Sequence, residues 1–299
     1  MRDSPLPEEP LVSVILTTHN RVHFLAEAIA SVLAQSYHNW ELLVVDHGST
    51  DGTSDYLAIL PGRITPLYLP QSGRPSIAYN RGLAAARGQL VAFLHDDDRW
   101  RADKLAHQVA QFQANPVIAF VYSDTNLLFG DGRIISRALY PSQKHQGWLF
   151  EPLLGDCFIH PSVFMGWRPA LDAVGWFDES LVTGEEYELW LRLAYRYPAG
   201  FSPETLATIR QHGNQFSRQS RIQLIYGNVI TVLQRTGRSY PLTIRQRWQL
   251  NHHLARTHTH LGLTYLAETN KKEARHHFWQ SLRLNPLQRR AWQAMYSSL

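Results

Sequence analysis

The sequence predicts an α/β fold with a mostly parallel central sheet, helices on both of its faces, and a small all-helical appendage at its C-terminal end. Short apolar runs rich in Val, Ile and Leu alternate with segments whose apolar residues recur at helical spacing. One run, Leu90–Leu94, is apolar throughout and ends in four polar residues, as expected of a strand covered on both faces. Because the carboxyl ends of parallel strands meet at one edge of a sheet, polar residues there indicate a ligand-binding cleft.

Composition sets the class of protein. The chain has 299 residues, of which 44% are hydrophobic and 18% charged, so it has ample material for a core. No apolar run approaches the ~18 residues of a membrane span, and the N-terminus lacks the apolar stretch of a signal peptide. Cys157 is the only cysteine, which excludes an intrachain disulfide. We therefore expect a cytoplasmic protein in which Cys157 is a core residue.

The alternation of strands and helices can be followed along the first domain. Pro66 has no N–H to donate, which places its strand at or near the edge of the sheet. A later hairpin is expected around Gly130–Gly132, with a further strand over 159–165. The main strands are expected over 11–16, 41–45, 64–69, 90–94 and 117–121, and the helices over 22–34, up to 60, 75–86 and around 105–112.

The three carboxylates that follow the fourth strand indicate either a cation site or a solvated turn. Asp96, Asp97 and Asp98 are adjacent, and crowded carboxylates repel one another unless a cation neutralises them. Hard divalent ions prefer oxygen ligands. On these residues alone the two interpretations are equally good.

Five motifs in a fixed order resemble one enzyme family. Together they resemble the GT-A inverting glycosyltransferases of family 2, over roughly residues 11–217. This resemblance implies a GT-A domain over 1–217 that holds a nucleotide sugar and its acceptor, and a helical region over 218–299. The motifs are Val14–Asn20, Val44–Asp51, Asn80–Gly88, Phe93–Asp98, and Val174–Glu179 with Glu185–Arg192.

The resemblance also implies the residues that bind the donor. His47 stands where the family commonly has a second acid facing the uracil, so it lacks that fixed negative charge, and a UDP-sugar is the default donor. A surface turn residue is the alternative for His47, and a solvated arginine is the alternative for Arg74. The implied donor-binding residues are Thr17, His19, Asp46, His47, Arg74 and, at the ribose, Asp96.

A metal site is implied as well. Asp97 and Asp98 match the metal-binding acids, and His212 lies in a segment that closes the domain in many members of the family. Mn²⁺ or Mg²⁺ suits such ligands and would neutralise charge on the leaving diphosphate. His95 departs from the acid that many members have at its position, and His212 can equally be an ordinary loop histidine.

The resemblance places the catalytic base at Glu186. This glutamate lies on one helical face with apolar residues, so we expect it to be partly buried and its pKa to be raised. Glu185 is expected on a solvated face, where Glu188 and Arg192 can pair four residues apart. The alternative for Glu186 is a capping box with Thr183 at the helix start.

The C-terminal quarter is predicted to be helical. Residues 222–237 have helical spacing, and residues 261–286 match a single tetratricopeptide repeat. One repeat cannot bury its face alone, so it must pack on neighbouring helices, on the first domain or on a partner, which can be a second copy of the chain. Basic residues are concentrated after Arg210, which leaves open a peripheral contact at the inner face of the membrane beside ordinary solvation. No nucleic-acid-binding module is present.

The expected activity is sugar transfer from a nucleotide-diphosphate donor to a hydroxyl of a polysaccharide, lipid-linked glycan or similar acceptor. A nucleotidyltransferase is one alternative, but it would be expected to carry a Gly-rich basic loop where Thr17–Asn20 stands. A non-catalytic scaffold that binds a partner through its helices is the other alternative.

Overall fold

The computed structural model describes residues 6–60, 62–71, 73–136, 139, 143–212 and 221–298. The chain forms two compact units. Residues 1–149 and 158–212 make up an α/β unit, and residues 150–157 and 213–299 make up a helical unit. The boundary predicted at residue 217 lies outside the described residues.

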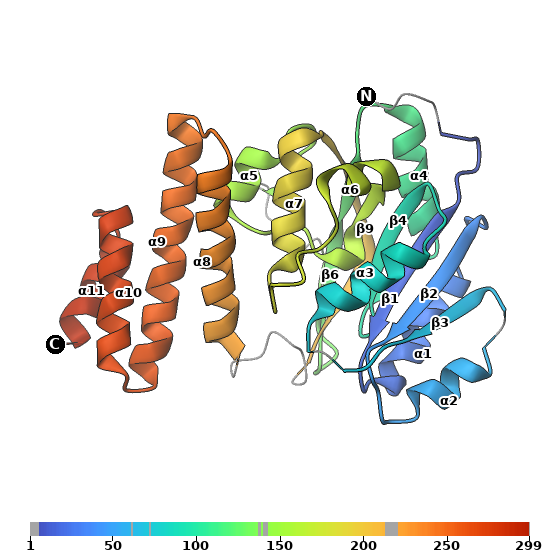
Figure 1. The fold of residues 1–299 in the computed structure, drawn as a ribbon, viewed down its shortest axis with the longest axis horizontal. Helices are drawn as coiled ribbons and strands as arrows, with labels where there is room; N and C mark the ends of the chain where they lie inside the picture. The colour runs from blue at the N-terminus through green and yellow to red at the C-terminus, as the bar shows by residue number, and fades with distance from the viewer. Residues whose placement is uncertain are drawn as a thin grey trace. The chain divides into compact units, whose positions relative to one another are not determined.

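A mixed, mostly parallel sheet forms the α/β unit and confirms the predicted fold class (Figure 1). The first four strands are parallel to one another, and the proline-containing strand is at the edge, as predicted. The short strand β7 (Ile134–Ile135) pairs with β6 and forms the predicted hairpin. In spatial order the other strands are β3 (Ile64–Tyr68), β2 (Trp40–Asp46), β1 (Val12–Thr18), β4 (Leu90–His95), β8 (Met165–Trp167), β6 (Phe120–Phe129), β9 (Ala199–Gln211) and β5 (Arg99–Trp100).

Helices flank the sheet, and one of them approaches it closely (Figure 1). A Cβ atom on Gly82 would lie 2.4 Å from Cγ2 of Ile15, so only glycine lets α3 (Pro75–Ala85) lie this near to β1. Side chains alternate along a strand, so Thr17 of β1 faces the same helix as Ile15. The other helices of this unit are α1 (Val22–Leu33), α2 (Thr53–Ala58), α4 (Lys104–Ala114), α6 (Arg168–Val174) and α7 (Glu185–Arg196).

Two local predictions were wrong. The expected strand over 159–165 is instead a 3-10 turn, η2 (Pro161–Val163), followed by the short strand β8. Pro161 has no N–H for a ladder, and the His160 ring accepts a hydrogen bond from the Ser162 N–H, which closes the turn. Cys157 is exposed rather than part of the core.

The helical unit is all-helical, as predicted. The helix α9 begins with a capping box formed by Thr243 and Gln246, and its Gly262 packs against the buried ring of Phe278. None of the helices among the described residues is long and apolar enough to cross a membrane. The helices of this unit are α5 (Phe150–Gly155), α8 (Ile222–Ser239), α9 (Ile244–Ala267), α10 (Lys271–Leu284) and α11 (Arg289–Ser298).

Two buried polar residues of the helical unit, His258 of α9 and Ser281 of α10, pair with polar groups on the neighbouring helix. His258 and His277 face each other with their Nδ1 atoms 3.0 Å apart, and the Ser281 hydroxyl lies 2.8 Å from that of Thr259. Both residues therefore have a hydrogen-bonding partner between α9 and α10.

Candidate functional site

The polar residues that follow three parallel strands meet at one edge of the sheet. Thr18 lies opposite Asp46 on β2, and Thr17 lies opposite His95 on β4. Because the three strands end in register, the residues after them share the edge at which open α/β sheets bind ligands. This is the arrangement expected from the sequence.

Two histidines lie on the β1–β2 side of this edge. The rings of His19 and His47 are 6.5 Å apart, and Nε2 of His19 lies 3.2 Å from the Gln71 amide. His47 is only 8% exposed, so it is not a surface turn residue. Burial lowers the pKa of His47, and His19 adds to this effect. Nδ1 of His19 is buried and has no hydrogen-bond partner within the described ranges.

The predicted donor residue Asp46 shapes the turn after β2. Its Oδ1 atom accepts a hydrogen bond from the Ser49 N–H at 3.0 Å, and the residue is 3% exposed. The Thr17 side chain forms a hydrogen bond with Tyr79 of α3. Asp46 therefore stabilises the turn after β2, and Thr17 connects the end of β1 to α3.

Arg21 links the first two acids of the triplet, a role that sequence reasoning missed. Its Nη1 atom lies 3.0 Å from Oδ1 of Asp96 and 2.8 Å from Oδ2 of Asp97. Asp96 also accepts a hydrogen bond from the Thr18 hydroxyl at 2.8 Å. Burial raises the pKa of Asp96 to about 6, although Arg21 opposes this shift. The available signal was the position of Arg21 in the polar exit of the first strand.

Asp97 and His212 lie together, as the sequence analysis expected of two metal ligands. Nε2 of His212 is 3.0 Å from Oδ2 of Asp97. Burial raises the pKa of Asp97, but His95, Arg21 and His212 together outweigh burial and hold that pKa below its usual 3.8. Asp97 is therefore an ionised carboxylate at neutral pH.

Asp98 faces different partners from Asp97. Its carboxylate accepts hydrogen bonds from the Ser162 hydroxyl at 2.6 Å and from the Arg210 N–H at 3.0 Å. Burial raises the pKa of Asp98 well above 3.8, and Asp97 raises it further. The two acids expected to bind one ion are thus held by separate groups.

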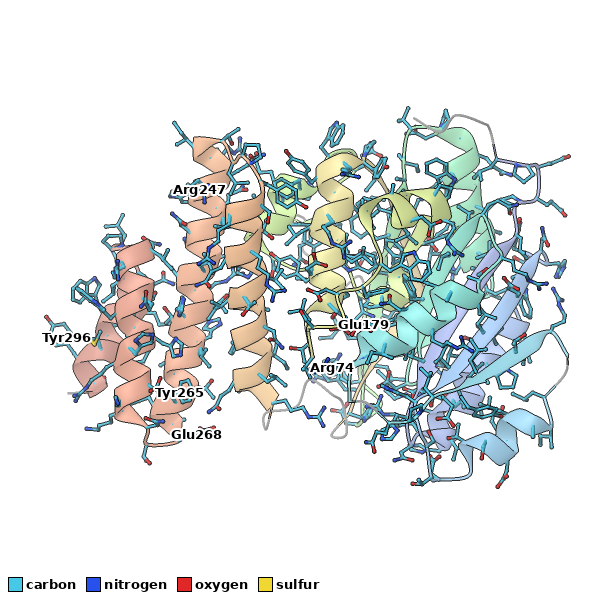
Figure 2. All side chains as sticks on the ribbon, in the orientation of Figure 1. Arg74, Glu179, Arg247, Tyr265, Glu268 and Tyr296 are labelled. Atoms are coloured by element: carbon cyan, nitrogen blue, oxygen red, sulfur yellow. The ribbon has the colours of Figure 1, made fainter. Side chains whose placement is uncertain are left out.

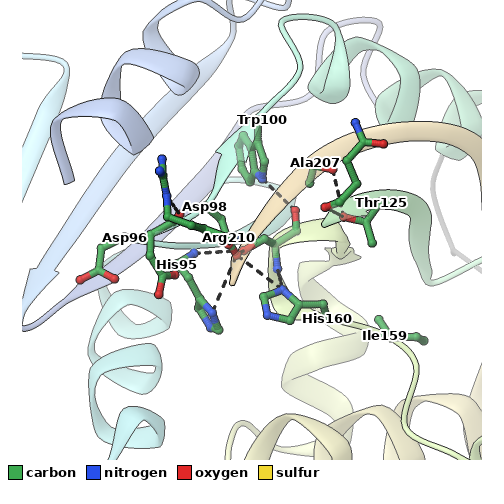
Figure 3. Close-up of polar contacts among 12 residues, drawn as sticks. His95, Asp96, Asp98, Trp100, Thr125, Ile159, His160, Ala207 and Arg210 are labelled. Carbon is green, nitrogen blue, oxygen red and sulfur yellow. Dashed lines mark hydrogen bonds and ion pairs between the residues drawn. The ribbon is translucent and has the colours of Figure 1, made fainter. Parts of the chain in front are cut away.

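Asp98 also lies in a cluster with two histidines (Figure 3). Oδ2 of Asp98 is 4.0 Å from Nδ1 of His95 and 3.7 Å from Nδ1 of His160. Burial lowers the pKa of both rings, and it lowers that of His160 to about 3, so the His160 ring is neutral at pH 7. One ligand atom from each of the three residues lies within 4.8 Å of the others, which is compatible with a cation.

Asp97 with His212 is a second set of groups of the kind that ligate a divalent ion, and Oδ2 of Asp97 also pairs with Arg21. Nδ1 of His160 also accepts a hydrogen bond from the Ser162 N–H at 3.2 Å. A hard ion such as Mg²⁺ or Mn²⁺ prefers the ionised oxygen ligand, and imidazole-rich sets suit softer ions.

A buried tyrosine connects this cluster to the opposite wall of the site. The Tyr79 hydroxyl lies 2.5 Å from Nε2 of His95. Burial raises the pKa of Tyr79 well above 10, and the charges of Glu185 and Glu186 raise it further. Glu186 also raises the pKa of His95, so this glutamate lies within electrostatic reach of the end of β4.

The start of α7 differs from the capping box considered as the alternative for Glu186. Gly184 is the N-cap residue, in a left-handed conformation with φ 76°, so the helix begins at Glu185. Glu186 is therefore the second helical residue, one position short of the place that a capping-box glutamate occupies. The capping-box alternative for Glu186 does not apply.

Glu185, not Glu186, is the deeply buried acid, which corrects the expected solvated face. Glu185 is 4% exposed, and its Oε2 atom has no hydrogen-bond partner among the described residues. Burial raises the pKa of Glu185 well above 4.5, and the neighbouring Glu186 raises it further. Because α7 is buried over a wide arc, Glu185 shares that arc with Leu189 and Leu193.

Side-chain bonds fix the segment expected to face the acceptor. Asn80 donates a hydrogen bond to the Phe177 carbonyl and accepts one from the Phe177 N–H, both at 3.0 Å. Arg192 pairs with Glu188 at 2.6 Å, as predicted. Arg74, expected at the donor, donates a hydrogen bond to the Glu179 carbonyl at 3.0 Å, and the two residues lie close together in Figure 2.

Comparisons with known proteins identify a family. The model of Glycosyl transferase family 2 matches residues 13–174. TuaG of Bacillus subtilis, a glycosyltransferase assigned to teichuronic acid biosynthesis, is 36% identical over 46% of this chain and 55% of its own length. The UDP-Glc:alpha-D-GlcNAc-diphosphoundecaprenol beta-1,3-glucosyltransferase WfgD of Escherichia coli is 33% identical over 62% of this chain and 70% of its own.

Solved structures share the fold at low identity. Residues 1–349 of Staphylococcus aureus TarS with UDP-GlcNAc superpose with a TM-score of 0.72 at 16% identity, covering 96% of this chain and 88% of that one. The chain spans 55% of TuaG and 33% of a Rickettsia felis glycosyltransferase. The chain has the GT-A fold and belongs to glycosyl transferase family 2.

Proposed function

We propose that the protein is an inverting glycosyltransferase that moves a sugar from a nucleotide-diphosphate donor to an acceptor hydroxyl. The observation that carries this proposal is the convergence of three strand ends with Glu186 of α7. Glu186 acts electrostatically on both His95 and Tyr79, and His95 directly precedes the acidic triplet. These interactions support a carboxylate base close to the polar edge of the sheet, the arrangement that direct displacement at a sugar carbon requires.

Glu186 is proposed as the general base. It would take the proton from the acceptor hydroxyl while that oxygen attacks the anomeric carbon from the side opposite the leaving diphosphate. Burial raises the pKa of the neighbouring Glu185 well above 4.5 and favours its protonated form, so Glu185 is not proposed as the base.

The donor would bind along the strand ends. His19 has a buried nitrogen without a partner within the described ranges, and His47 is neutral, so both can exchange hydrogen bonds with a nucleotide. Asp96 would contact the ribose. Arg74 is proposed only for the rim of the donor site, because it donates to the Glu179 carbonyl.

Mn²⁺ or Mg²⁺ would be held by Asp97 and His212, with Asp98 nearby. When bound, such an ion supplies Lewis-acid stabilisation of the leaving diphosphate. Arg21 already places a positive charge on Asp96 and Asp97, and it can neutralise part of the same region.

The names of relatives suggest the substrates. WfgD is named for transfer from UDP-Glc to a diphosphoundecaprenol-linked sugar, and a mannosyltransferase of Pyrobaculum calidifontis was solved with GDP-Man and Mn²⁺. We propose a UDP-sugar as donor and a polysaccharide or lipid-linked glycan as acceptor, with the reaction at the cytoplasmic face of the membrane.

Calorimetry with UDP-, GDP- and dTDP-sugars, each with and without Mn²⁺, tests the proposal. We expect metal-dependent binding of one donor, followed by release of the nucleoside diphosphate when an acceptor is added. Binding of no nucleotide would favour a scaffold that uses the helical unit, and release of pyrophosphate from a nucleoside triphosphate with a sugar phosphate would favour nucleotidyl transfer.

A further inference from the structure

The last two helices carry a basic and aromatic surface that the proposed transfer reaction does not use. On α10, Lys272, His276, Trp279 and Arg283 are exposed. Their spacing of four, three and four residues puts them on one stripe of the helix. The buried residues of α10, among them Phe278, lie on its opposite side.

The next helix extends the same chemistry. Arg289 and Tyr296 of α11 are exposed, and Tyr296 points away from α9 in Figure 2. We call these residues, with the four of the α10 stripe, the basic–aromatic face. Trp279 is 56% exposed and Tyr296 71% exposed, so large rings remain in contact with water.

Acidic residues are scarce in this part of the sequence, where Glu273 in the first turn of α10 is the last one. Residues 274–299 contain four arginines and neither aspartate nor glutamate. Solvation alone would account for the arginines but not for exposed indole and phenol rings beside them. Rings with an apolar body and a polar tip are enriched where one side is apolar and the other wet.

We propose that the basic–aromatic face binds the surface of an anionic lipid bilayer. Lys272, Arg283 and Arg289 would approach the negative headgroups, and the rings of Trp279 and Tyr296 would enter the interface. A second copy of the chain is a poorer occupant, because two such faces would bring like charges together. The binding goes beyond the proposed sugar transfer and requires neither donor nor acceptor.

The test is flotation of the full chain with vesicles of phosphatidylcholine alone or mixed with phosphatidylglycerol, at low and high salt. We expect binding to the anionic vesicles only, and loss of that binding as salt rises. In the double variant Arg283→Glu with Arg289→Glu, affinity should fall by roughly 30-fold or more, at about a factor of 5 for each positive charge lost at the surface. Trp279→Ala should weaken binding while leaving its salt dependence unchanged.

A matched variant controls for net charge. Arg81→Glu with Arg133→Glu makes the same charge change at exposed positions of the α/β unit and should keep vesicle binding. Equal loss in both double variants, or equal binding to neutral vesicles, would overturn the proposal. It would also fail if the face bound soluble polyglutamate but no vesicle, or if Trp279→Ala abolished a dimer detected by light scattering. Circular dichroism of each variant separates lost binding from lost folding.

Discussion

The two units treat charge in opposite ways. The α/β unit buries acids, with Asp96, Asp97, Asp98 and Glu185 each at most 6% exposed, and it shifts their pKa values. The helical unit keeps its arginines and lysines largely at the surface and buries histidines in their neutral form. Burying a charged group costs free energy, but it allows the pKa of that group to be shifted for chemistry. An exposed charge costs little free energy and attracts partners of opposite charge.

The largest expected effect comes from the paired acids at the start of α7. Glu186→Gln should keep donor binding but lower kcat by about 10²–10⁴-fold, the usual contribution of a general base. The matched variant Glu185→Gln resembles a protonated glutamate, so it should lower kcat by less than about tenfold. If the two variants lose activity equally, or if Glu186→Gln stays active, the assignment of the base is wrong. Steady-state kinetics with calorimetric donor binding measures both.

The second effect tests the cost of buried acids directly. Arg21→Met leaves Asp96 and Asp97 without their guanidinium partner, and breaking such a pair typically costs about 3–5 kcal/mol of unfolding free energy. Urea unfolding should show this loss, while Arg81→Met, at an exposed site on α3, should change stability by less than about 0.5 kcal/mol. A small loss in Arg21→Met would mean that the acids are neutralised by other groups.

The third effect belongs to the helical unit. Burial lowers the pKa of His253 and of His258 to about 4 from 6.5. The unfolded chain therefore binds more protons, and the stability present above pH 6.5 is lost as the pH falls toward 4, by up to about 3 kcal/mol for each histidine. Thermal unfolding at pH 7.5 and pH 5 should show this loss, and it should be smaller in His258→Gln. An unchanged pH dependence in that variant would contradict the interpretation.

The smallest effect concerns packing under the site. Gly82→Ala would improve helix propensity in isolation, but the new Cβ meets Ile15 at 2.4 Å, so we expect a net loss of about 1–3 kcal/mol. Gly62→Ala is the matched control, because nothing lies within 4 Å of its Cβ position. Chemical denaturation compares the two, and a stabilised Gly82→Ala would show that α3 can move away without cost.

Sequence reasoning predicted the fold and the edge of the sheet at which the polar residues meet. The parallel strands follow from the alternation of apolar runs with helical segments, and the edge position of Pro66 follows from its missing N–H. Contacts between side chains that are far apart in the sequence could not be predicted. Arg21 is 75 residues from Asp96, and Asp98 turns toward Ser162 rather than toward Asp97, because a turn far along the chain supplies the donor.

The burial of Glu185 was missed for a related reason. A single helical stripe predicts one buried face, but α7 is buried over a wider arc, so a residue assigned to water lies inside. The exposure of Cys157, which residue type alone placed in the core, also depends on the packing around it. Periodicity predicts which face of a helix points toward the core, but it does not predict how wide the buried arc of that helix is.

Tyr79 and Asn80 are consecutive residues of α3 with different duties. The Tyr79 hydroxyl forms a hydrogen bond with the His95 ring at the end of β4. The Asn80 side chain forms hydrogen bonds with the backbone carbonyl and N–H of Phe177. A single peptide bond thus joins the side of the site proposed for the donor to the side proposed for the acceptor. A substitution at Tyr79 or Asn80 is therefore expected to affect both proposed substrate sites. We expect new specificities to arise in loops away from this helical turn.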